Sequence, residues 1–319
     1  MILLVRSLRV SVAIVTYRRA WALPYSLTSL VNQTRRPDEV VVVLKPSGDG
    51  GEEVISRFSS SLPIKLVIQR EGFVVQAYQM AIDNASGDII LFLDDDAVVE
   101  EKWIEKYIEL FKELPNVAGI GGTIYKAYLN NDVLLKTQEY FISAKSSTKP
   151  LRNIFYRKPL PELSDYVHWL SIAGFRGFKQ IPEEGVFKSI GLCGANMGLK
   201  REAIADCPIA ELYRRSRKGY LFEQVLAYCA RRKGFDIYEV RGSRAPIVWH
   251  IMHEQSLTRG KGFWREFWIH YDRVASYWRL KRLGANVSFT AYFIACIVAL
   301  RRKTLPQLLA TIYAWIVRI

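Results

Sequence analysis

Three adjacent carboxylates, Asp94, Asp95 and Asp96, are the residues of this sequence that most clearly predict chemistry. They follow residues 89–93 (IILFL), an apolar run typical of a strand buried on both faces. Neighbouring carboxylates repel one another, so this cluster is costly unless a cation lies beside it. Alternate strand residues point to one side, so Asp94 and Asp96 could share an ion. Oxygen ligands favour Mg²⁺ or Mn²⁺ bound to a substrate phosphate. A solvated acidic turn before a helix is the alternative.

Alternating strands and helices are expected to position this cluster. The apolar runs predict strands at residues 10–15, 40–44, 64–68 and 89–93, with helices at 21–33, from about 52 to 60, and at 74–84. This alternation predicts an α/β fold with a mostly parallel, Rossmann-like sheet and helices on both faces. Such sheets bind ligands beyond the carboxyl ends of their strands. A second polar run, residues 16–19, follows the first strand, so both runs should meet in one crevice.

The remaining chain is less regular. It predicts helices at 101–114 and 220–232, strands at 117–127, 237–240 and 246–249, and a Gly-rich turn at 191–199. Residues 128–184 are polar, aromatic and proline-containing, which indicates little sheet pairing. The pattern breaks near Gly260 and Gly262. We therefore expect a catalytic domain at 1–258 and a helical tail at 259–319.

Composition narrows the class of protein. The chain has 319 residues, half of them hydrophobic, and a net charge of +14, so it can bury a large core and should attract phosphate groups. The acidic cluster would repel nucleic acid, which argues against a nucleic-acid partner. The four cysteines are widely spaced and show no CxxC pair, a pattern that fits a reducing cytosol. The first ten residues do not form a convincing signal peptide.

Two long segments resemble the family 2 glycosyltransferases, which share the GT-A fold. Residues 10–43 (VSVAIVTYRRAWALPYSLTSLVNQTRRPDEVVVV) are similar to the opening of that family, and residues 85–106 (ASGDIILFLDDDAVVEEKWIEK) are similar to its DxD segment. The resemblance covers roughly residues 9–258. It implies transfer of a sugar from a nucleotide-sugar donor to a hydroxyl acceptor, with inversion, using Mn²⁺ or Mg²⁺ on the diphosphate.

The resemblance also implies site residues on the donor side. The residues assigned to the donor nucleotide are Thr16, Tyr17, Arg19, Asp94 and Asp95, and Asp96 is assigned to the metal. The family often has Asp-Asp-Gly-Ser after the second strand, whereas this chain has Leu44, Lys45, Pro46 and Ser47. Lys45 therefore either meets a phosphate or is a surface loop lysine.

The acceptor side follows from two further segments. Residues 191–197 resemble the family's acceptor segment, in which Gly194 would allow close approach and Asn196 would donate to a sugar hydroxyl. The family's base lies in a Glu-Asp pair that opens a helix, and here that pair reads Glu223 and Gln224. Glu223 is therefore the expected base, with a helix-capping role as the alternative. Asp206 and Glu184 are weaker candidates.

Residues 248–262 (VWHIMHEQSLTRGKG) resemble the segment that closes the family's active site. His250 is assigned to the metal, with His253 as the alternative ligand. Arg259 and Lys261 are assigned to phosphate, as parts of a loop that closes over the donor. The alternative for His250 and His253 is a purely structural role.

The tail predicts an amphipathic helix. Aromatic residues from Trp264 to Trp278 recur at helical spacing beside arginines and lysines, a pattern typical of a helix that lies in a membrane interface. Arg301, Arg302 and Lys303 favour anionic lipid. We expect a cytoplasmic enzyme, peripheral on the inner face of the cell membrane, acting on a saccharide or lipid-linked acceptor. A helix that packs on the catalytic domain and a membrane span are the alternatives for the tail.

Two other functions remain compatible with the sequence. A nucleotidyltransferase on a related α/β fold would use the same carboxylates to support attack on phosphorus, although a Gly-rich loop typical of pyrophosphorylases is not evident near the N-terminus. A non-catalytic protein that binds lipid or nucleic acid would use the positive charge alone.

Overall fold

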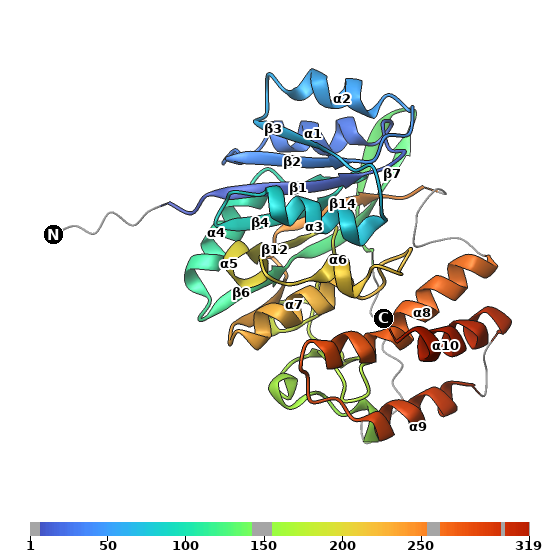
Figure 1. Cartoon of the computed structure of the whole chain (residues 1–319). Coiled ribbons are helices and arrows are strands. Elements are labelled where there is room, and N and C mark those ends of the chain that lie inside the picture. The colour runs from blue at the N-terminus through green and yellow to red at the C-terminus, as the bar shows by residue number, and fades with distance from the viewer. Residues whose placement is uncertain (1–6, 142–154, 254–261, 301–303, 319) are drawn as a thin grey trace.

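The computed structural model describes residues 7–141, 155–253, 262–300 and 304–318. Figure 1 shows a large central sheet between helices, with three C-terminal helices packed beside it. The carboxyl ends of the central strands face the region where the C-terminal helices lie close to the sheet.

The central sheet has eight strands in the order β11-β13-β6-β12-β4-β1-β2-β3. The four strands at its β3 end are mutually parallel: β1 (Val10–Thr16), β2 (Glu39–Leu44), β3 (Ile64–Ile68) and β4 (Ile89–Asp94). The other four are β6 (Val117–Gly121), β11 (Gly185–Lys188), β12 (Met197–Lys200) and β13 (Asp236–Arg241), of which β12 and β11 run antiparallel to their neighbours. This confirms the mostly parallel sheet that the sequence predicts.

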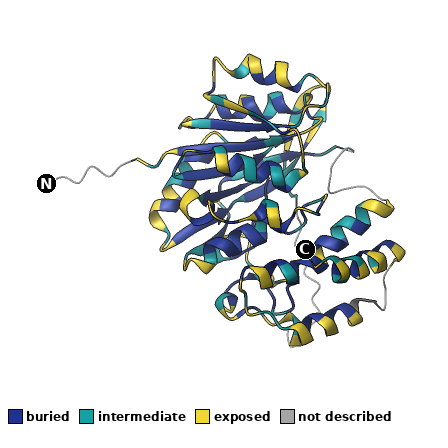
Figure 2. Cartoon of the chain, in the orientation of Figure 1, coloured by how far each residue is buried: buried dark blue, intermediate teal, exposed yellow. Residues whose placement is uncertain are grey.

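Each face of the sheet is covered by helices because alternate strand residues enter separate cores. One core holds Val12, Ile14 and Leu91 beneath α1 (Leu23–Val31), α2 (Gly51–Phe58) and α4 (Trp103–Glu113). The opposite core holds Ala13, Ile90 and Phe92 beneath α3 (Val74–Asn84), α5 (Arg201–Ile204), α6 (Ile209–Leu212) and α7 (Phe222–Arg232). Strands buried on both faces explain the unbroken apolar runs in the sequence (Figure 2).

A second sheet lies at the carboxyl end of β4. Its strands follow the order β5 (Ala97–Val99), β14 (Ile247–Ile251), β7 (Thr123–Asn130) and β8 (Val133–Tyr140). The strand expected at 117–127 is in fact two strands, β6 and β7, which separate at Gly122. A Cβ atom on Gly122 would lie 2.3 Å from the Pro246 carbonyl oxygen, so the backbone can change sheets here only because the residue is glycine.

The expectation of little sheet pairing across residues 128–184 was wrong for several described parts. Strand β8 pairs with β7 over most of its length, and β9 (His168–Leu170) pairs with β10 (Arg176–Phe178). The single-turn helices η2 (Phe155–Arg157) and η3 (Pro161–Leu163) precede β9. The β7–β8 hairpin was missed because its exposed strands alternate too weakly in hydropathy.

The tail forms three helices, α8 (Phe263–Arg282), α9 (Phe289–Leu300) and α10 (Leu305–Val317), around a third core. The aromatic face of α8 was expected to meet lipid, and this was wrong for most of that face, although Trp264 at its start is exposed. Phe267, Tyr271 and Val274 are buried, and Phe267 and Tyr271 contact Tyr313 of α10. Among the residues that the structure describes, no helix combines the length and the hydropathy needed to cross a bilayer.

Two of the four cysteines form a disulfide, between Cys207 and Cys229, which the sequence did not predict. Helix α7 brings Cys229 against the α5–α6 connection that carries Cys207. Disulfides are rare in most cytosolic proteins, although hyperthermophiles use them inside the cell. The cysteines therefore do not support the expected reducing compartment.

Candidate active site

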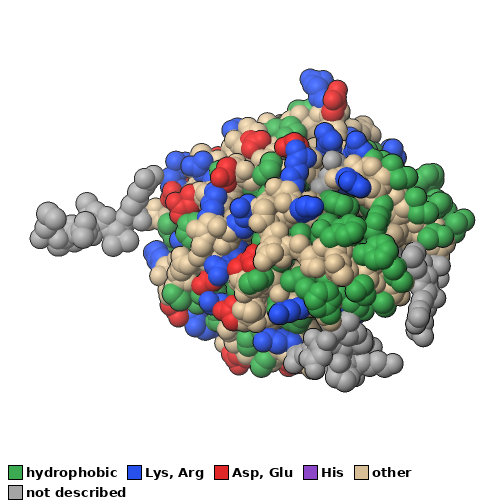
Figure 3. Space-filling view, turned by 60° about the horizontal axis from the view of Figure 1, so that its bottom comes forward, with side chains coloured by type: hydrophobic (Ala, Val, Ile, Leu, Met, Phe, Trp, Pro, Cys, Tyr) green, Lys and Arg blue, Asp and Glu red, His purple; other side chains and the backbone are tan. Residues whose placement is uncertain are grey.

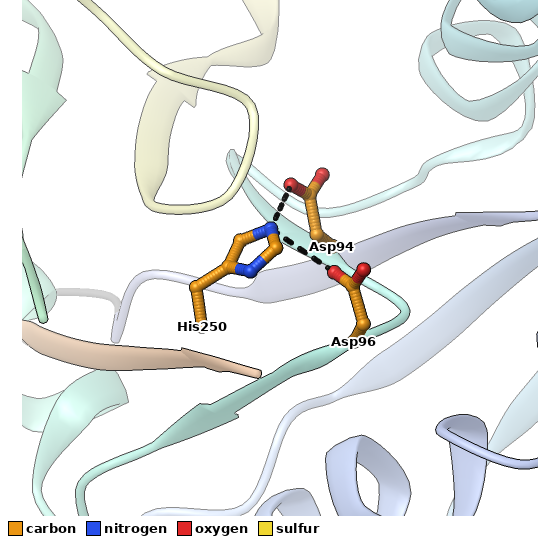
Figure 4. A group of neighbouring side chains, drawn as sticks. All are labelled: Asp94, Asp96 and His250. Atoms are coloured by element: carbon orange, nitrogen blue, oxygen red, sulfur yellow. Dashed lines mark ion pairs between the residues drawn. The ribbon is translucent and has the colours of Figure 1, made fainter. Parts of the chain in front are cut away.

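His250 directs one ring nitrogen at both Asp94 and Asp96, which lie at the carboxyl end of β4 (Figure 4). Asp94 is the last residue of β4, and Asp96 immediately precedes β5. His250 reaches them from the adjacent β14, with its Nε2 3.1 Å from Asp96 Oδ1 and 3.6 Å from Asp94 Oδ2. One ligand atom from each residue falls within a group spanning no more than 4.8 Å. The strand register therefore gathers two carboxylates and one imidazole from distant parts of the sequence.

The backbone sets which nitrogen of His250 faces the carboxylates. His250 Nδ1 lies 3.1 Å from the Ile251 carbonyl oxygen. A carbonyl oxygen only accepts, so Nδ1 carries the hydrogen and Nε2 is directed at Asp94 and Asp96. Burial opposes the charged form of this ring, but the hydrogen bond with Asp94 and the charges of both aspartates raise the pKa of His250. A divalent cation would take the place of the proton on Nε2. Because the carboxylate oxygens of Asp94 and Asp96 and the unprotonated Nε2 of His250 can all act as ligands, this donor set fits Mn²⁺ or Mg²⁺.

Asp95 and Asp96 experience different surroundings. Burial, followed by the charge of Asp96, raises the pKa of Asp95 well above its ordinary value, although a hydrogen bond from Thr16 opposes the shift. Burial also acts on Asp96, but the charge of His250 and the hydrogen bond from His253 outweigh it and lower the pKa of Asp96. Asp96 is therefore the carboxylate most fully committed to the charged form.

Residues of the first polar run reach the same crevice. Arg19 Nε lies 3.9 Å from Asp95 Oδ1 and 3.7 Å from Asp96 Oδ2. Tyr17 is exposed at the carboxyl end of β1, with Arg18 and Lys45 over its ring. The two polar runs thus meet, as the parallel topology predicts.

Lys45 and His253 lie at the edge of this crevice. Lys45 Nζ donates to the Gly72 carbonyl oxygen at 2.7 Å, so it has a structural contact. His253 Nε2 is 2.7 Å from Asp96 Oδ2, and its ring meets Trp21 edge-on. Of the two histidines, His250 contacts both Asp94 and Asp96, whereas His253 contacts Asp96. Arg259 and Lys261 lie outside the described residues.

Glu223 stands on the first turn of α7, within electrostatic reach of Asp94. Burial, together with the charge of Asp94, raises the pKa of Glu223 to about 7, although backbone N–H groups of Glu223 and Gly194 donate to its carboxylate and Arg176 also stabilises its charge. A carboxylate with this pKa can take up a proton near neutral pH. Gln224, by contrast, is buried and donates to the Leu192 carbonyl oxygen.

The two weaker candidates for the base lie elsewhere. Asp206 pairs with Lys233, and Glu184 accepts a hydrogen bond from Ser243. Glu223 is therefore the candidate that adjoins Asp94.

Gly194 is held between Glu223 and Tyr78. Its N–H donates to Glu223, and a Cβ atom at Gly194 would lie 2.5 Å from Tyr78 Oη. Tyr78 in turn donates to Asp94 Oδ1 at 3.4 Å. Sequence reasoning missed Tyr78, because a tyrosine on a helix reads as a core residue and only the fold brings it to Asp94.

The expected contact of Asn196 with a sugar does not fit this structure. Its Oδ1 accepts from Trp103 and Tyr107, and its Nδ2 donates to the carbonyl oxygens of Thr123 and Pro246. The side chain is buried and its four hydrogen-bonding positions are all used inside the protein. Asn196 joins α4 to the strand ends, so we do not assign it to the acceptor.

A cleft of about 690 Å³ is lined by Tyr220 and Leu221, just before α7, and extends to the helices of the tail. Cys193 and Leu221, which neighbour Gly194 and Glu223 in the sequence, lie at one part of its wall, and Ala295 and Val298 of α9 lie at another. Arg176, whose charge acts on Glu223, also lines it. This cleft could not be predicted from the sequence, because its walls come from segments as far apart as Gly121 and Gln307.

Comparisons with known proteins agree with the motifs. The model of glycosyl transferase family 2 matches residues 11–204. A chondroitin synthase of Escherichia coli is 35% identical over 118 residues, covering 36% of this chain and 17% of that protein. A glucosyl-dolichyl phosphate glucuronosyltransferase of Haloferax volcanii is 28% identical over 124 residues, covering 37% and 38%. The chain thus spans well under half the length of either relative.

A solved structure supports the fold. GalNAc-T7 with UDP, GalNAc and Mn²⁺ superimposes with a TM-score of 0.57 at 13% identity, covering 84% of this chain and 48% of that one. This similarity confirms the expected GT-A-type fold.

Proposed function

Because the chain belongs to glycosyl transferase family 2, we propose that it transfers a sugar from a nucleotide-sugar donor to an acceptor hydroxyl. The observation that carries the proposal is the placement of Asp94, Asp96 and His250 beside Glu223, at the carboxyl ends of the parallel strands. This arrangement sets a candidate cation site next to a carboxylate able to accept a proton. Both can assist transfer to a hydroxyl.

The cation we propose is Mn²⁺ or Mg²⁺, held by Asp96 and His250 with Asp94 beside them. When bound, it would neutralise the diphosphate leaving group. The nucleotide would lie between the two polar runs. The residues we propose for it are Thr16, Tyr17, Arg19, Asp94 and Asp95. Arg259 and Lys261 remain proposed phosphate ligands.

We propose Glu223 as the base of an inverting reaction. Its carboxylate would take the proton of the acceptor hydroxyl as that oxygen bonds to the anomeric carbon and the carbon–oxygen bond to the diphosphate breaks. Glu223 is poised for this because burial and Asp94 hold its pKa near neutrality. Gly194 would keep the carboxylate in place through its N–H.

We further propose that the tail, residues 259–319, places the catalytic domain, residues 1–258, on an anionic membrane surface. Helices α9 and α10 contain no charged residue. Their exposed apolar side chains are Phe289, Phe293, Ile294, Ile297, Val298, Leu305, Leu308, Leu309, Ile312 and Ile316, here named the α9–α10 face. Figure 3 shows hydrophobic side chains gathered over these helices.

Exposed cations lie near the α9–α10 face. Lys281 and Arg318 both contact the ring of Trp278, which packs against Phe289. Apolar side chains with cations beside them match a surface of anionic lipid. An attachment of this kind needs no helix that crosses the bilayer. The cytoplasmic leaflet stays a proposal.

A panel of nucleotide sugars tests the function. The protein is incubated with Mn²⁺ and each donor, and the released nucleotide is identified with and without saccharide acceptors. We expect one donor to yield a nucleoside diphosphate only when Mn²⁺ or Mg²⁺ is present, and Asp96→Ala to abolish the release. Release of pyrophosphate instead would indicate a nucleotidyltransferase. No product from any donor would contradict the proposed activity.

A further inference from the structure

The cleft that Cys193 and Leu221 line also carries arginines from separate elements on its wall. Arg157 ends η2, Arg176 begins β10, and Arg273 lies on α8. All three are exposed, and none of them is in an ion pair with a residue that the structure describes, whereas His168 and Arg241 of the same cleft pair with Glu239. Arg273 lies over the Tyr220 ring, just before α7. Three arginines that line one cleft without an ion-paired carboxylate offer a binding surface for an anion.

The acidic residue that lines the cleft does not offset this charge. Glu239 Oε1 lies 2.8 Å from Arg241 Nη2, and Glu239 Oε2 lies 2.8 Å from His168 Nδ1. Burial opposes its charge, but His168 and Arg241 outweigh burial and lower the pKa of Glu239 to about 2. Glu239 is therefore neutralised by its own partners, and the cleft keeps a positive excess from Arg157, Arg176 and Arg273.

One wall of the cleft is apolar and continues to the outside of the tail. Ala295 and Val298 of α9 line it. Val298 is also part of the α9–α10 face, with 47% of its surface exposed. A ligand in the cleft can thus meet the arginines with an anionic group and the α9 wall with a hydrocarbon chain.

We propose that this cleft is the acceptor site and that the acceptor is a saccharide linked to a lipid through phosphate. The saccharide supplies the hydroxyl that reacts, and the phosphate is bound by Arg157, Arg176 and Arg273. This inference rests on the proposed function for the identity of the reaction, but the binding site stands on the cleft alone. A soluble sugar phosphate would share the anionic group and lack the chain that the α9 wall accommodates.

Direct binding tests the site without turnover. Farnesyl phosphate below its micellar concentration, farnesol, and glucose 6-phosphate are titrated into the full chain by calorimetry. We expect farnesyl phosphate to bind most tightly. Arg157→Ala and Arg273→Ala should each weaken it about tenfold or more, the usual scale for a hydrogen bond to a charged group. Arg273→Lys should recover part of the loss. Arg244→Ala, which removes an exposed arginine paired with Glu113, is the matched control.

Each other result contradicts a defined part of the inference. If farnesol binds as tightly as farnesyl phosphate, the cleft has no anion site. If glucose 6-phosphate binds as tightly as farnesyl phosphate, the cleft does not bind the hydrocarbon chain. If both arginine variants bind farnesyl phosphate with unchanged affinity, the phosphate does not bind at these arginines. Metal-dependent release of nucleotide from the donor is measured separately on the wild-type protein. If the protein releases no nucleotide but still binds farnesyl phosphate, the proposed function is wrong and the proposed binding site is retained.

Discussion

Arg279 and Asp272 form an ion pair that has no exposed surface, with Arg279 Nη2 2.7 Å from Asp272 Oδ1. Both residues belong to α8, yet their other contacts reach the catalytic domain. Arg279 donates to the Leu212 carbonyl oxygen and stacks on Tyr213, and Asp272 accepts from Ser216 and from the Tyr220 backbone N–H. The pair therefore anchors α8 to the segment that leads into α7 and Glu223.

Asp272→Asn is expected to destabilise the protein by about 3–5 kcal/mol, because it leaves the Arg279 charge buried without its partner. Chemical denaturation measures the change in the free energy of unfolding. Glu211→Gln is the matched control, since it breaks an exposed pair with Arg282 on the same helix and should cost no more than about 1 kcal/mol. A similar small loss in both variants would show that the buried pair does not anchor the tail.

Removal of the divalent cation is expected to abolish transfer. Asp96→Ala and His250→Ala should both lose the response to added Mn²⁺, because each removes one of the proposed ligands. Transfer by the wild-type protein in excess chelator, and again after Mn²⁺ is restored, gives the comparison. Activity that persists in chelator would leave Asp96 and His250 with another role.

The pH dependence of transfer should follow the titration of the Glu223 carboxylate. A base must be deprotonated, and the pKa of Glu223 is raised to about 7. A cation at Asp94 would offset part of that shift, so with saturating metal the acid limb should lie near or below pH 7. Along that limb kcat/KM should rise about tenfold per pH unit, and it should level off above it.

Glu223→Gln should lower transfer by about 10²- to 10⁴-fold while donor binding is retained. Asp206→Asn, which alters an exposed carboxylate paired with Lys233, should keep the full pH profile. If the acid limb stays near pH 7 in a residually active Glu223→Gln protein, the titrating group is another residue.

The sheet and the acidic end of β4 could be predicted from the sequence because both follow from local patterns. The bounds of β3 and α3 match their predicted ranges, residues 64–68 and 74–84. Continuous apolar runs mark strands that are buried on both faces, and the carboxylates directly follow one of them. The fold then brings Arg19 to Asp95 through parallel pairing of β1 with β4.

The acceptor side could not be predicted in the same way. Asn196 is polar and sits in a Gly-rich segment, which suggests ligand contact, but the structure uses it to bind Trp103 and Tyr107. The cleft depends on Arg157, Arg176 and Arg273, which are isolated in sequence and meet only in the tertiary fold. The spacing of aromatic residues along α8 also led to a wrong prediction of lipid contact, since α10 covers most of that face.

Membrane attachment is expected to depend on the α9–α10 face. Ile312→Glu and Ile297→Glu each place a charge on an exposed apolar position of that face, and a buried charge at the lipid boundary is costly. Both should reduce flotation with anionic liposomes, while Leu135→Glu, an exposed apolar position on β8, should float like the wild type. Raised salt should weaken the binding, because part of it comes from cations near anionic headgroups.

The alternative occupant of the α9–α10 face is a second copy of the chain. Sedimentation of the same proteins without lipid separates the two. A wild-type monomer that floats with anionic vesicles, and a variant monomer that does not, is the expected result. A wild-type dimer that Ile312→Glu converts to monomer, with flotation equal in all variants, would assign the face to self-association and overturn the membrane proposal.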